Sequence, residues 1–139
     1  TYFERYTGVR KYMDSTKVLA KKNLYVETIL GRKLHVAAIN DSNGLRRQAA
    51  ERAAINAPLQ GSAADIIKKA MIDVDSWIGE DNQNIKMIMQ VHDELIFEVK
   101  KDFAADALAD VIKIMESAVK LDIPLIVDAN QGANWNEAH

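Results

Sequence analysis

Three consecutive side chains that could bind a metal ion or a phosphate interrupt an apolar stretch: His92, Asp93 and Glu94. Apolar residues occupy every second position over residues 85–91, and an apolar run follows over residues 95–99, the pattern of two β-strands. Because so few residues separate these runs, we expect a tight antiparallel hairpin that carries the three side chains at its tip. Carboxylates are usual protein ligands of Mg²⁺, and two such ions about 3.5–4 Å apart can activate an attacking oxygen and stabilise a leaving one. The alternative is a solvated turn without a function.

A single pair of adjacent carboxylates cannot form a complete two-metal site, because a second carboxylate, from another strand, normally bridges the ions. The remaining acidic residues are expected on exposed helix faces and at helix caps, not on a strand beside the hairpin; they include Asp73, Asp75, Glu80, Asp81, Asp102, Asp106 and Asp110. The sequence therefore predicts half of a metal site. It gives little support to a small metal-dependent nuclease, which needs a second acidic cluster or a general base.

A second candidate group consists of Arg52, Asn56 and Gln60, which follow one another at intervals of four residues and so share a helix face. All three donate hydrogen bonds, which suits the DNA minor groove, where every base pair presents acceptors. Such contacts check the shape of a base pair without reading its sequence. Arg46 and Arg47, at the start of the same helix, add charge for phosphates. The alternative is an exposed polar helix face that binds nothing.

The elements before these residues follow from apolar spacing. Apolar side chains at helical intervals predict an amphipathic helix over residues 2–21. Residues 25–29 and 33–36 read as two short strands that turn at Gly31. The polar loop 40–44 supplies capping residues for the helix that follows.

We expect the alanine-rich helix that begins at Leu45 to end at Pro58, because proline disfavours the helical conformation of the residue before it. A new helix then begins with Ser62 as its N-cap and with Asp65 in its first turn, where a carboxylate complements the helix dipole. Gly79 is the expected C-terminal stop.

The last part of the chain predicts one more helix and one more strand. The helix opens at residues 100–102 and places apolar residues on one face: Leu108, Val111, Ile112, Met115 and Val119. Residues 123–127 read as a strand, in which Pro124 is tolerated only near the start or on an edge. Strands clustered late among helices indicate an α+β fold, with helices packed on a small antiparallel sheet.

Composition narrows the class of protein. The chain has 139 residues, 48% of them hydrophobic, which is the size of one domain and excludes disordered and collagen-like chains. The sequence has no apolar run near the ~18 residues that span a bilayer, and residues 1–10 do not resemble a signal peptide. With no cysteine and three histidines, disulfides, thiolate chemistry and a histidine-rich zinc site are not expected. These features predict a soluble cytosolic domain.

The formal net charge of −2 conceals an uneven distribution. Residues 1–60 contain 11 Lys and Arg against 5 Asp and Glu, whereas residues 61–139 contain 7 against 15. A basic part joined to an acidic part suits a protein that holds a polyanion with one and a metal with the other. The charge division without any function is the alternative.

The motifs resemble a known family over essentially the whole chain. Residues 90–99, Gln-Val-His-Asp-Glu-Leu-Ile-Phe-Glu-Val, resemble motif C of the family A DNA polymerases, the bacterial DNA polymerase I group. Residues 52–65 resemble the segment that precedes motif C there. Residues 25–28 with Gly31-Arg32, and the ending from Asn134-Trp135 to Ala138-His139, are similar as well.

The resemblance implies a role for each candidate residue. Asp93 matches the metal-binding aspartate, Glu94 the acidic residue that supports the metal and the primer end, and His92 a contact to the primer terminus. Arg52, Asn56 and Gln60 match minor-groove contacts to template and primer. Residues 1–45 would be the end of the fingers subdomain, and residues 46–139 the C-terminal part of the palm.

The resemblance also implies what the chain lacks. In the family, the other metal-bridging aspartate lies in motif A, and the nucleotide-binding helix, motif B, ends shortly before the position of Thr1; neither is found in this sequence, nor are a thumb and an exonuclease domain. We therefore expect a C-terminal fragment, ending naturally at His139, that is inactive alone.

The parent implied is a DNA-directed DNA polymerase of replication and repair that adds nucleotides to a primer 3′ end with two Mg²⁺ ions. Its partners would be primer–template DNA and dNTP, in the bacterial cytoplasm at the nucleoid, with no membrane. The alternative is a non-catalytic nucleic-acid-binding or scaffolding module with a palm-like fold. Self-association through the surface that would face missing palm strands is a further hypothesis.

Overall fold

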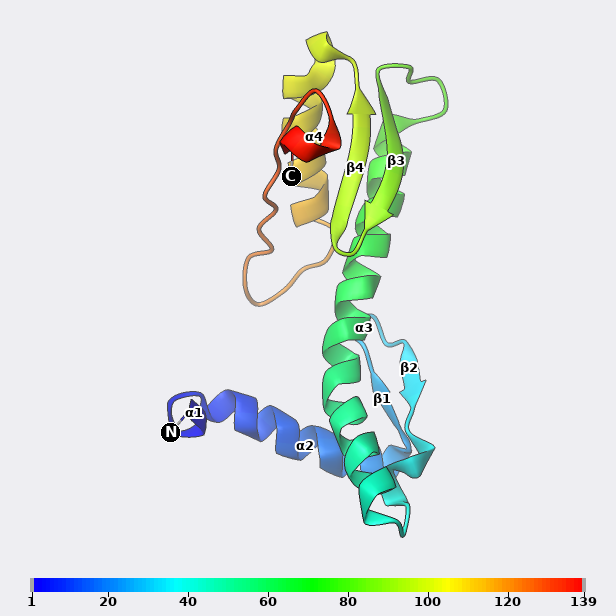
Figure 1. Ribbon diagram of the computed structural model, residues 1–139, viewed down its shortest axis with the longest axis vertical. Helices are drawn as coiled ribbons and strands as arrows, with labels where there is room; N and C mark the ends of the chain where they lie inside the picture. Colours follow the sequence, from blue (N-terminus) through cyan, green and yellow to red (C-terminus); the bar gives the residue numbers. More distant parts are fainter. Residues whose placement is uncertain (1, 139) are drawn as a thin grey trace. The chain divides into compact units, whose positions relative to one another are not determined.

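The computed structural model describes residues 2–138 and shows helices with two separate two-stranded antiparallel sheets (Figure 1), which confirms the α+β class. Thr1 and His139 lie outside the described residues. Within 2–138, no helix is long and apolar enough to cross a membrane. The elements in chain order are α1 Tyr2–Arg5, α2 Thr7–Asn23, β1 Tyr25–Glu27, β2 Lys33–His35, the 3-10 helix η1 Ala37–Asn40, α3 Gly44–Ile78, β3 Ile85–Val91, β4 Glu94–Val99, the 3-10 helix η2 Lys101–Phe103, α4 Ala104–Glu116 and α5 Trp135–Ala138.

The chain divides into two compact units, residues 1–65 and residues 66–139. The boundary falls inside α3, so the first unit contains the beginning of this helix and the second contains its end. The polar row Arg52, Asn56 and Gln60 belongs to the first unit, and the hairpin of β3 and β4 belongs to the second.

The N-terminal helix is interrupted at Tyr6, where the backbone leaves the helical region (φ −116°, ψ 64°). The sequence predicts one helix over residues 2–21; the structure has α1 and the longer α2, and Gly8 lies inside α2. At its other end α2 stops at Leu24, which adopts a left-handed conformation (φ 63°) and donates its N–H to the Ala20 carbonyl at 2.8 Å. This is an αL termination made without glycine.

The first hairpin forms as predicted. β1 pairs with β2 antiparallel, with Tyr25 opposite His35. The turn uses Gly31 at φ +78°, a conformation that glycine adopts without steric cost, and its N–H donates to the Thr28 carbonyl at 2.9 Å.

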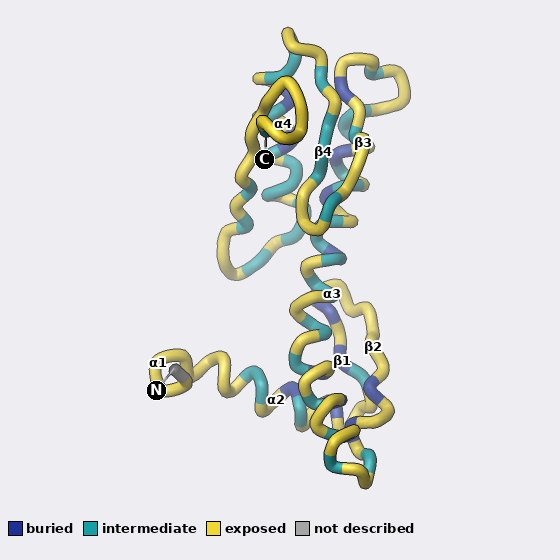
Figure 2. Tube along the Cα trace, in the orientation of Figure 1, coloured by how far each residue is buried: buried dark blue, intermediate teal, exposed yellow. Residues whose placement is uncertain are grey.

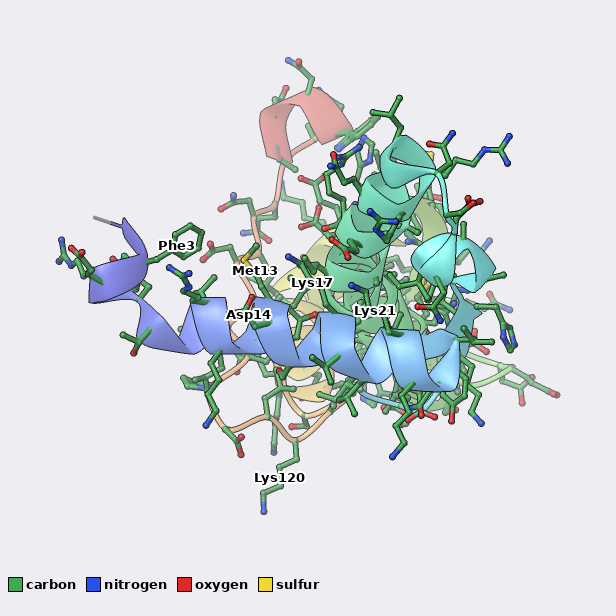
Figure 3. All side chains as sticks on the ribbon, turned by 90° about the horizontal axis from the view of Figure 1, so that it is seen from below. Phe3, Met13, Asp14, Lys17, Lys21 and Lys120 are labelled. Atoms are coloured by element: carbon green, nitrogen blue, oxygen red, sulfur yellow. The ribbon has the colours of Figure 1, made fainter. Side chains whose placement is uncertain are left out.

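The core of the first unit consists mainly of small side chains. Figure 2 shows in dark blue where the chain is buried. The buried members are Ala20, Val26, Val36, Ile39, Ala50 and Ala54. Alanines on α2 and α3 allow a close approach of these elements, and two polar contacts add to it. The Tyr12 hydroxyl donates to the Ile55 carbonyl at 2.9 Å, and the Lys21 ammonium lies 2.7 Å from the Glu51 carboxylate. Figure 3 shows Lys21 on α2, on the side that also carries Lys17.

The prediction that a helix ends at Pro58 and a new one begins at Ser62 is wrong, because α3 continues through both residues. A proline inside a helix removes one backbone hydrogen bond and costs roughly 3 kcal/mol on propensity scales. Contacts on both sides of Pro58 offset that cost: Tyr12 binds Ile55 before it, and the β1–β2 turn binds the turn of α3 after it. Tertiary contacts therefore outweigh the local preference of proline.

The start and the end of α3 agree with the sequence. The Asn43 side-chain oxygen accepts from the N–H groups of Leu45 at 3.0 Å and Arg46 at 3.3 Å, as expected for an N-cap. At the other end Gly79 has φ +69° and donates its N–H to the Asp75 carbonyl at 3.0 Å.

Larger apolar residues form the core of the second unit. Val74, Ile85, Ala107 and Val111 are buried, and the residues packed against them include Trp77, Phe97 and Phe103. The rings of Trp77 and Phe103 are stacked, with centroids 6.4 Å apart. In this core, residues of the β3–β4 hairpin pack against residues from the end of α3 and from α4. The prediction that Val119 lies on this helix is wrong, because α4 ends at Glu116.

The β3–β4 hairpin contains a bulge. Met87 pairs with Phe97 and Met89 pairs with Ile96, so Ile88 is an extra residue in β3. One extra residue reverses the alternation of side chains beyond it. Simple alternation predicts that Met89 points toward the core, as Ile85 and Met87 do. Because of the bulge, Met89 is exposed instead.

The predicted strand at residues 123–127 is also wrong, because the structure shows no strand there. Pro124 cannot donate to a ladder, and no strand among the described residues pairs with this segment. Ile123 and Ile126 are 72% and 75% exposed, whereas Val127 donates its N–H to the Glu116 carboxylate at 3.1 Å. Without a neighbouring strand among the described residues, this apolar segment stays irregular.

Candidate functional site

The tip of the second hairpin is a two-residue turn formed by His92 and Asp93, and Glu94 is already the first residue of β4, paired with Val91. The turn is therefore shorter by one residue than the sequence suggests. His92 adopts a left-handed conformation with φ +53°. This conformation is unfavourable for a residue with a β-carbon and persists only where the surroundings hold it.

Gln90 supplies part of that hold, because its side-chain amide donates to the His92 carbonyl at 2.9 Å. This contact satisfies a turn carbonyl from within the same strand. His92, Asp93 and Glu94 are all exposed, so solvent, metal ions and nucleic acid can reach their side chains. The two strands fix the backbone beneath them, as a binding residue requires.

The side chains at the turn offer the kind of ligand atoms that Mg²⁺ binds, but too few of them for a complete metal site. The carboxylates of Asp93 and Glu94 offer the hard oxygen ligands that Mg²⁺ prefers. Over residues 2–138, however, no group of three or more His, Cys, Asp or Glu side chains comes together to hold a metal ion. The residues present therefore fit Mg²⁺ by the type of their ligand atoms, and a metal site at this turn stays a prediction.

The second candidate group lies on the uninterrupted part of α3 on both sides of Pro58. Arg52, Asn56 and Gln60 are all exposed. Residues spaced by four on one helix form a row along its surface, so the row that the sequence predicts continues past the proline. Gln60 belongs to the helix and does not project from its end.

The two arginines at the start of α3 differ in their surroundings. Arg47 is half-buried and donates from Nη1 to the Asp41 carbonyl at 3.0 Å, so it also ties down the loop before the helix. The Arg46 side chain is 75% exposed, and its guanidinium lies 3.8 Å from the Asp41 carboxylate. Arg46 therefore offers its charge to solvent more fully than Arg47 does.

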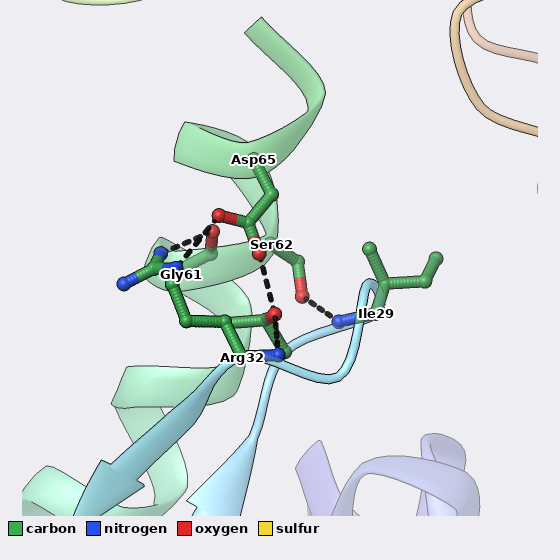
Figure 4. A network of polar contacts seen from close by, with 6 residues as sticks. Ile29, Arg32, Gly61, Ser62 and Asp65 are labelled. Carbon is green, nitrogen blue, oxygen red and sulfur yellow. Dashed lines mark hydrogen bonds and ion pairs between the residues drawn. The ribbon is translucent and has the colours of Figure 1, made fainter. Parts of the chain in front are cut away.

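The sequence did not predict a polar network in the first unit that is centred on the buried carboxylate of Asp65 (Figure 4). The Thr28 hydroxyl donates to Asp65 Oδ2, and Arg32 Nε donates to Asp65 Oδ1 at 2.8 Å. Asp65 is only 8% exposed, and it therefore serves as the acceptor of the β1–β2 turn and not as a dipole partner at a helix start.

Two neighbours in α3 complete the network. The Ser62 hydroxyl oxygen accepts the N–H of Ile29 at 2.9 Å, and the Gly61 carbonyl accepts from Arg32 Nη2 at 3.1 Å. The prediction that Ser62 is an N-cap is therefore wrong. We call the contacts of Thr28, Ile29 and Arg32 with Gly61, Ser62 and Asp65 the turn–helix latch. A signal for it existed: one carboxylate among alanines on a helix, and an arginine after a tight glycine turn.

Comparison with known proteins identifies relatives over nearly the whole chain. The sequence profile of DNA polymerase family A matches residues 1–137. DNA polymerase I of Pseudomonas aeruginosa is 48% identical over 138 residues, which are 99% of this chain and 15% of that protein. DNA polymerase I of Streptococcus pneumoniae is 46% identical over 138 residues, again 99% of this chain and 16% of that protein.

A solved structure is similar in fold as well as in sequence. The POL domain of Pol1 from M. smegmatis, in complex with DNA primer–template and dNTP, matches 99% of this chain with a TM-score of 0.94 and 44% identity. The match covers 24% of that chain. This chain thus spans about 15% of the length of the curated relatives it matches.

Proposed function

Because the chain belongs to DNA polymerase family A, we propose that it is a segment of a DNA-directed DNA polymerase that extends a primer 3′ end. One observation carries the proposal: the family match over residues 1–137 includes a two-residue turn that presents Asp93 at the tip of an antiparallel hairpin. The longer protein that contains this segment is called the full-length polymerase below. In it, residues 1–45 are the end of the fingers, and residues 46–139 belong to the palm.

The polar row on α3 is the DNA contact of this segment. Arg52, Asn56 and Gln60 are exposed and donate hydrogen bonds, so they suit the minor-groove acceptors of template and primer near the insertion site. Arg46 and Arg47 add contacts to phosphates. The neighbour from M. smegmatis was solved with primer–template and dNTP, which supports the same partners for the full-length polymerase.

The turn at His92 and Asp93 is the metal-binding and primer-end part. Asp93 would hold Mg²⁺, Glu94 would support the metal and the primer end, and His92 would contact the primer terminus. Bound Mg²⁺ supplies stabilisation of negative charge on the attacking and leaving oxygens. The role of this chain is to hold the Asp93 carboxylate in place while the primer 3′-oxygen attacks the α-phosphorus of the dNTP and pyrophosphate leaves.

The 139-residue chain alone is inactive in this proposal, because the two carboxylates at the turn are an incomplete ligand set within residues 2–138. Motif A and the triphosphate-binding helix of motif B would complete the site. The full-length polymerase acts in DNA replication and repair at the nucleoid, in the cytoplasm. Primer extension by the purified 139-residue chain above a no-enzyme control would contradict the inactivity.

Replacement of one carboxylate tests the assignment. In the full-length polymerase we expect Asp93→Asn to lower single-nucleotide incorporation roughly 100-fold or more, as is typical when one electrostatic group of an active site is removed. Asp122→Asn is the matched control, since Asp122 is an exposed aspartate in a loop of the same unit. Incorporation at the wild-type rate by Asp93→Asn, with DNA still bound, would favour the non-catalytic binding module instead.

A further inference from the structure

A proline interrupts the polar row of Arg52, Asn56 and Gln60, which we call the DNA-contact row because of its proposed function. Arg52 and Asn56 precede Pro58 in α3, and Gln60 follows it by two residues. Proline removes one hydrogen bond of the helix ladder, and its ring crowds the carbonyl four residues earlier, which commonly kinks a helix. The helix backbone alone therefore defines the position of Gln60 relative to the other two less strictly than in an unbroken ladder.

The two sides of the proline are each attached to other elements of the first unit. Before it, the Tyr12 hydroxyl on α2 donates to the Ile55 carbonyl at 2.9 Å. After it, the turn–helix latch attaches Gly61, Ser62 and Asp65 to the β1–β2 turn. The first attached residue after the proline, Gly61, is the immediate neighbour of Gln60.

The latch fits closely. A β-carbon added at Gly61 would lie 2.6 Å from the Thr28 Cγ2 methyl and 3.4 Å from Arg32 Nη2. Only a residue without a side chain allows this approach of the turn to the helix. The fit restricts how far the helix can rotate or slide against the turn.

Separating the groups of the latch would also cost free energy. Asp65 is buried, and its two oxygens accept from the Thr28 hydroxyl and the Arg32 guanidinium. A buried carboxylate that loses its donors keeps its full desolvation penalty. Any shift of the helix turn that separates these groups is therefore opposed.

The latch and the DNA-contact row lie on different sides of α3. At about 100° per residue, Gly61 shares a face with the buried Ala54, seven residues earlier. Arg52 and Asn56 are exposed, and the latch contacts drawn in Figure 4 involve neither of them nor Gln60. Any effect of the latch on bound DNA is therefore transmitted through the backbone of α3.

We propose that the turn–helix latch is a positioning device, in which Arg32, Thr28 and Asp65 fix Gln60 in line with Arg52 and Asn56 across Pro58. Arg32 and Asp65 are positioning residues: they act on primer–template DNA through Gln60. The inference rests on the proposed function, because it assumes that Gln60 contacts DNA.

A double-mutant cycle in the full-length polymerase tests the proposal, with the dissociation constant for primer–template DNA measured by fluorescence anisotropy. Arg32→Ala and Gln60→Ala should each weaken binding about tenfold, the change that corresponds to one hydrogen bond to a charged group. The double variant should be no more than about twofold weaker than Gln60→Ala alone, since residues that act through one another are not additive. Arg32→Lys, which retains a charge for Asp65, should recover part of the binding.

Two results separate a failure of the inference from a failure of the proposed function. If Gln60→Ala binds primer–template as the wild type does, the DNA-contact row is wrong, and the inference falls with it. If Gln60→Ala weakens binding and the losses of the two single variants multiply in the double variant, Arg32 does not act through Gln60. That outcome overturns the inference and leaves the proposed function intact.

A second pair of variants keeps the test valid if Arg32→Ala does not fold. Gly61→Ala should lower primer–template affinity because its β-carbon meets the Thr28 methyl, and Thr28→Ser should restore affinity because it removes that methyl and keeps the hydroxyl. Restoration in the double variant Gly61→Ala/Thr28→Ser supports the latch. Weak binding in a double variant whose thermal unfolding equals that of the wild type would overturn it.

Discussion

The two units of this chain hold their candidate residues in different ways. In the first unit the polar row of Arg52, Asn56 and Gln60 lies on a helix whose course past Pro58 is supported by contacts with the β1–β2 turn, above all those that the buried carboxylate of Asp65 accepts. In the second unit, Asp93 lies on a two-residue turn between paired strands, fixed by backbone pairing and by one contact from Gln90.

The hydrophobic cores of the two units also differ in composition. The first is built mainly of alanine and valine, and polar contacts supplement it. The second contains stacked aromatic rings and larger aliphatic residues, with the hairpin packed directly on it. We infer that the polar row is placed by a close-fitting polar attachment between two elements, whereas the turn of His92 and Asp93 is placed by strand pairing over an apolar core.

The largest expected effect is on the apolar core of the second unit. Ile85 is 1% exposed, so Ile85→Ala in the 139-residue chain should lower the free energy of unfolding by about 2–5 kcal/mol, from lost burial and the cavity that remains. Denaturant unfolding measures the loss. Amide hydrogen exchange should show that protection is lost in residues 66–138 and kept in residues 2–65.

Ile88→Ala is the matched control, because Ile88 is the extra residue of the bulge and is 56% exposed. It should change the free energy of unfolding by less than about 0.5 kcal/mol. Equal loss of protection in both units on Ile85→Ala would show that they unfold together and that the comparison does not hold.

The same difference explains which elements the sequence can predict. Short-range signals succeed: Gly31 and Gly79 adopt the positive φ values expected of them, and Asn43 caps α3. Alternation of apolar residues predicts β3 and β4, because their pairing is local and antiparallel. The fold class and the place of Asp93 at the hairpin tip follow from these local rules.

Signals that depend on distant partners fail. Pro58 locally disfavours a helix, and only the attachment to the β1–β2 turn makes the continuous α3 understandable. Residues 123–127 have strand-like composition without a strand beside them. Asp65 is predicted as a helix-start carboxylate, since its neighbours along the chain set it apart as a lone carboxylate among alanines but do not show that the distant Arg32 binds it.

Replacing either of two glycines should change the free energy of unfolding by a smaller amount, with opposite signs in the two units. Gly79→Ala should destabilise the chain by about 1 kcal/mol, because its φ of +69° is unfavourable for a residue with a β-carbon. Gly8→Ala, inside α2, should stabilise by about 0.5–1 kcal/mol, because alanine has the higher helix propensity and the added methyl meets no atom within 4 Å. Thermal unfolding of both variants measures the pair, and two shifts of the same sign would refute the assigned conformations.

The smallest effect concerns the ion pair between Lys21 and Glu51 in the first unit. A hydrogen bond from Lys21, aided by the charges of Lys17 and Arg47, holds the pKa of Glu51 below its usual value of 4.5. A lowered pKa in the folded state stabilises the fold above pH 4.5, and this contribution is lost as the pH falls through the lower, folded value. For a partly exposed pair it should stay below about 1 kcal/mol.

Urea unfolding at pH 7 and at pH 3 measures this contribution. Glu51→Gln should lower stability more at pH 7 than at pH 3, and Lys21→Met should remove most of that pH dependence, because it removes the partner. An equal effect of Glu51→Gln at both pH values would contradict the ion pair as a source of stability.

Metal-directed backbone cleavage tests the central claim most directly, because it reports which residues surround the bound ion. Fe²⁺ would replace Mg²⁺ in the full-length polymerase bound to primer–template and dNTP, and ascorbate with peroxide would generate radicals at the ion. We predict cuts next to Asp93 that excess Mg²⁺ suppresses and that disappear in Asp93→Asn but not in Asp122→Asn. Cuts elsewhere in the chain, with none around the turn of His92 and Asp93, would contradict the account.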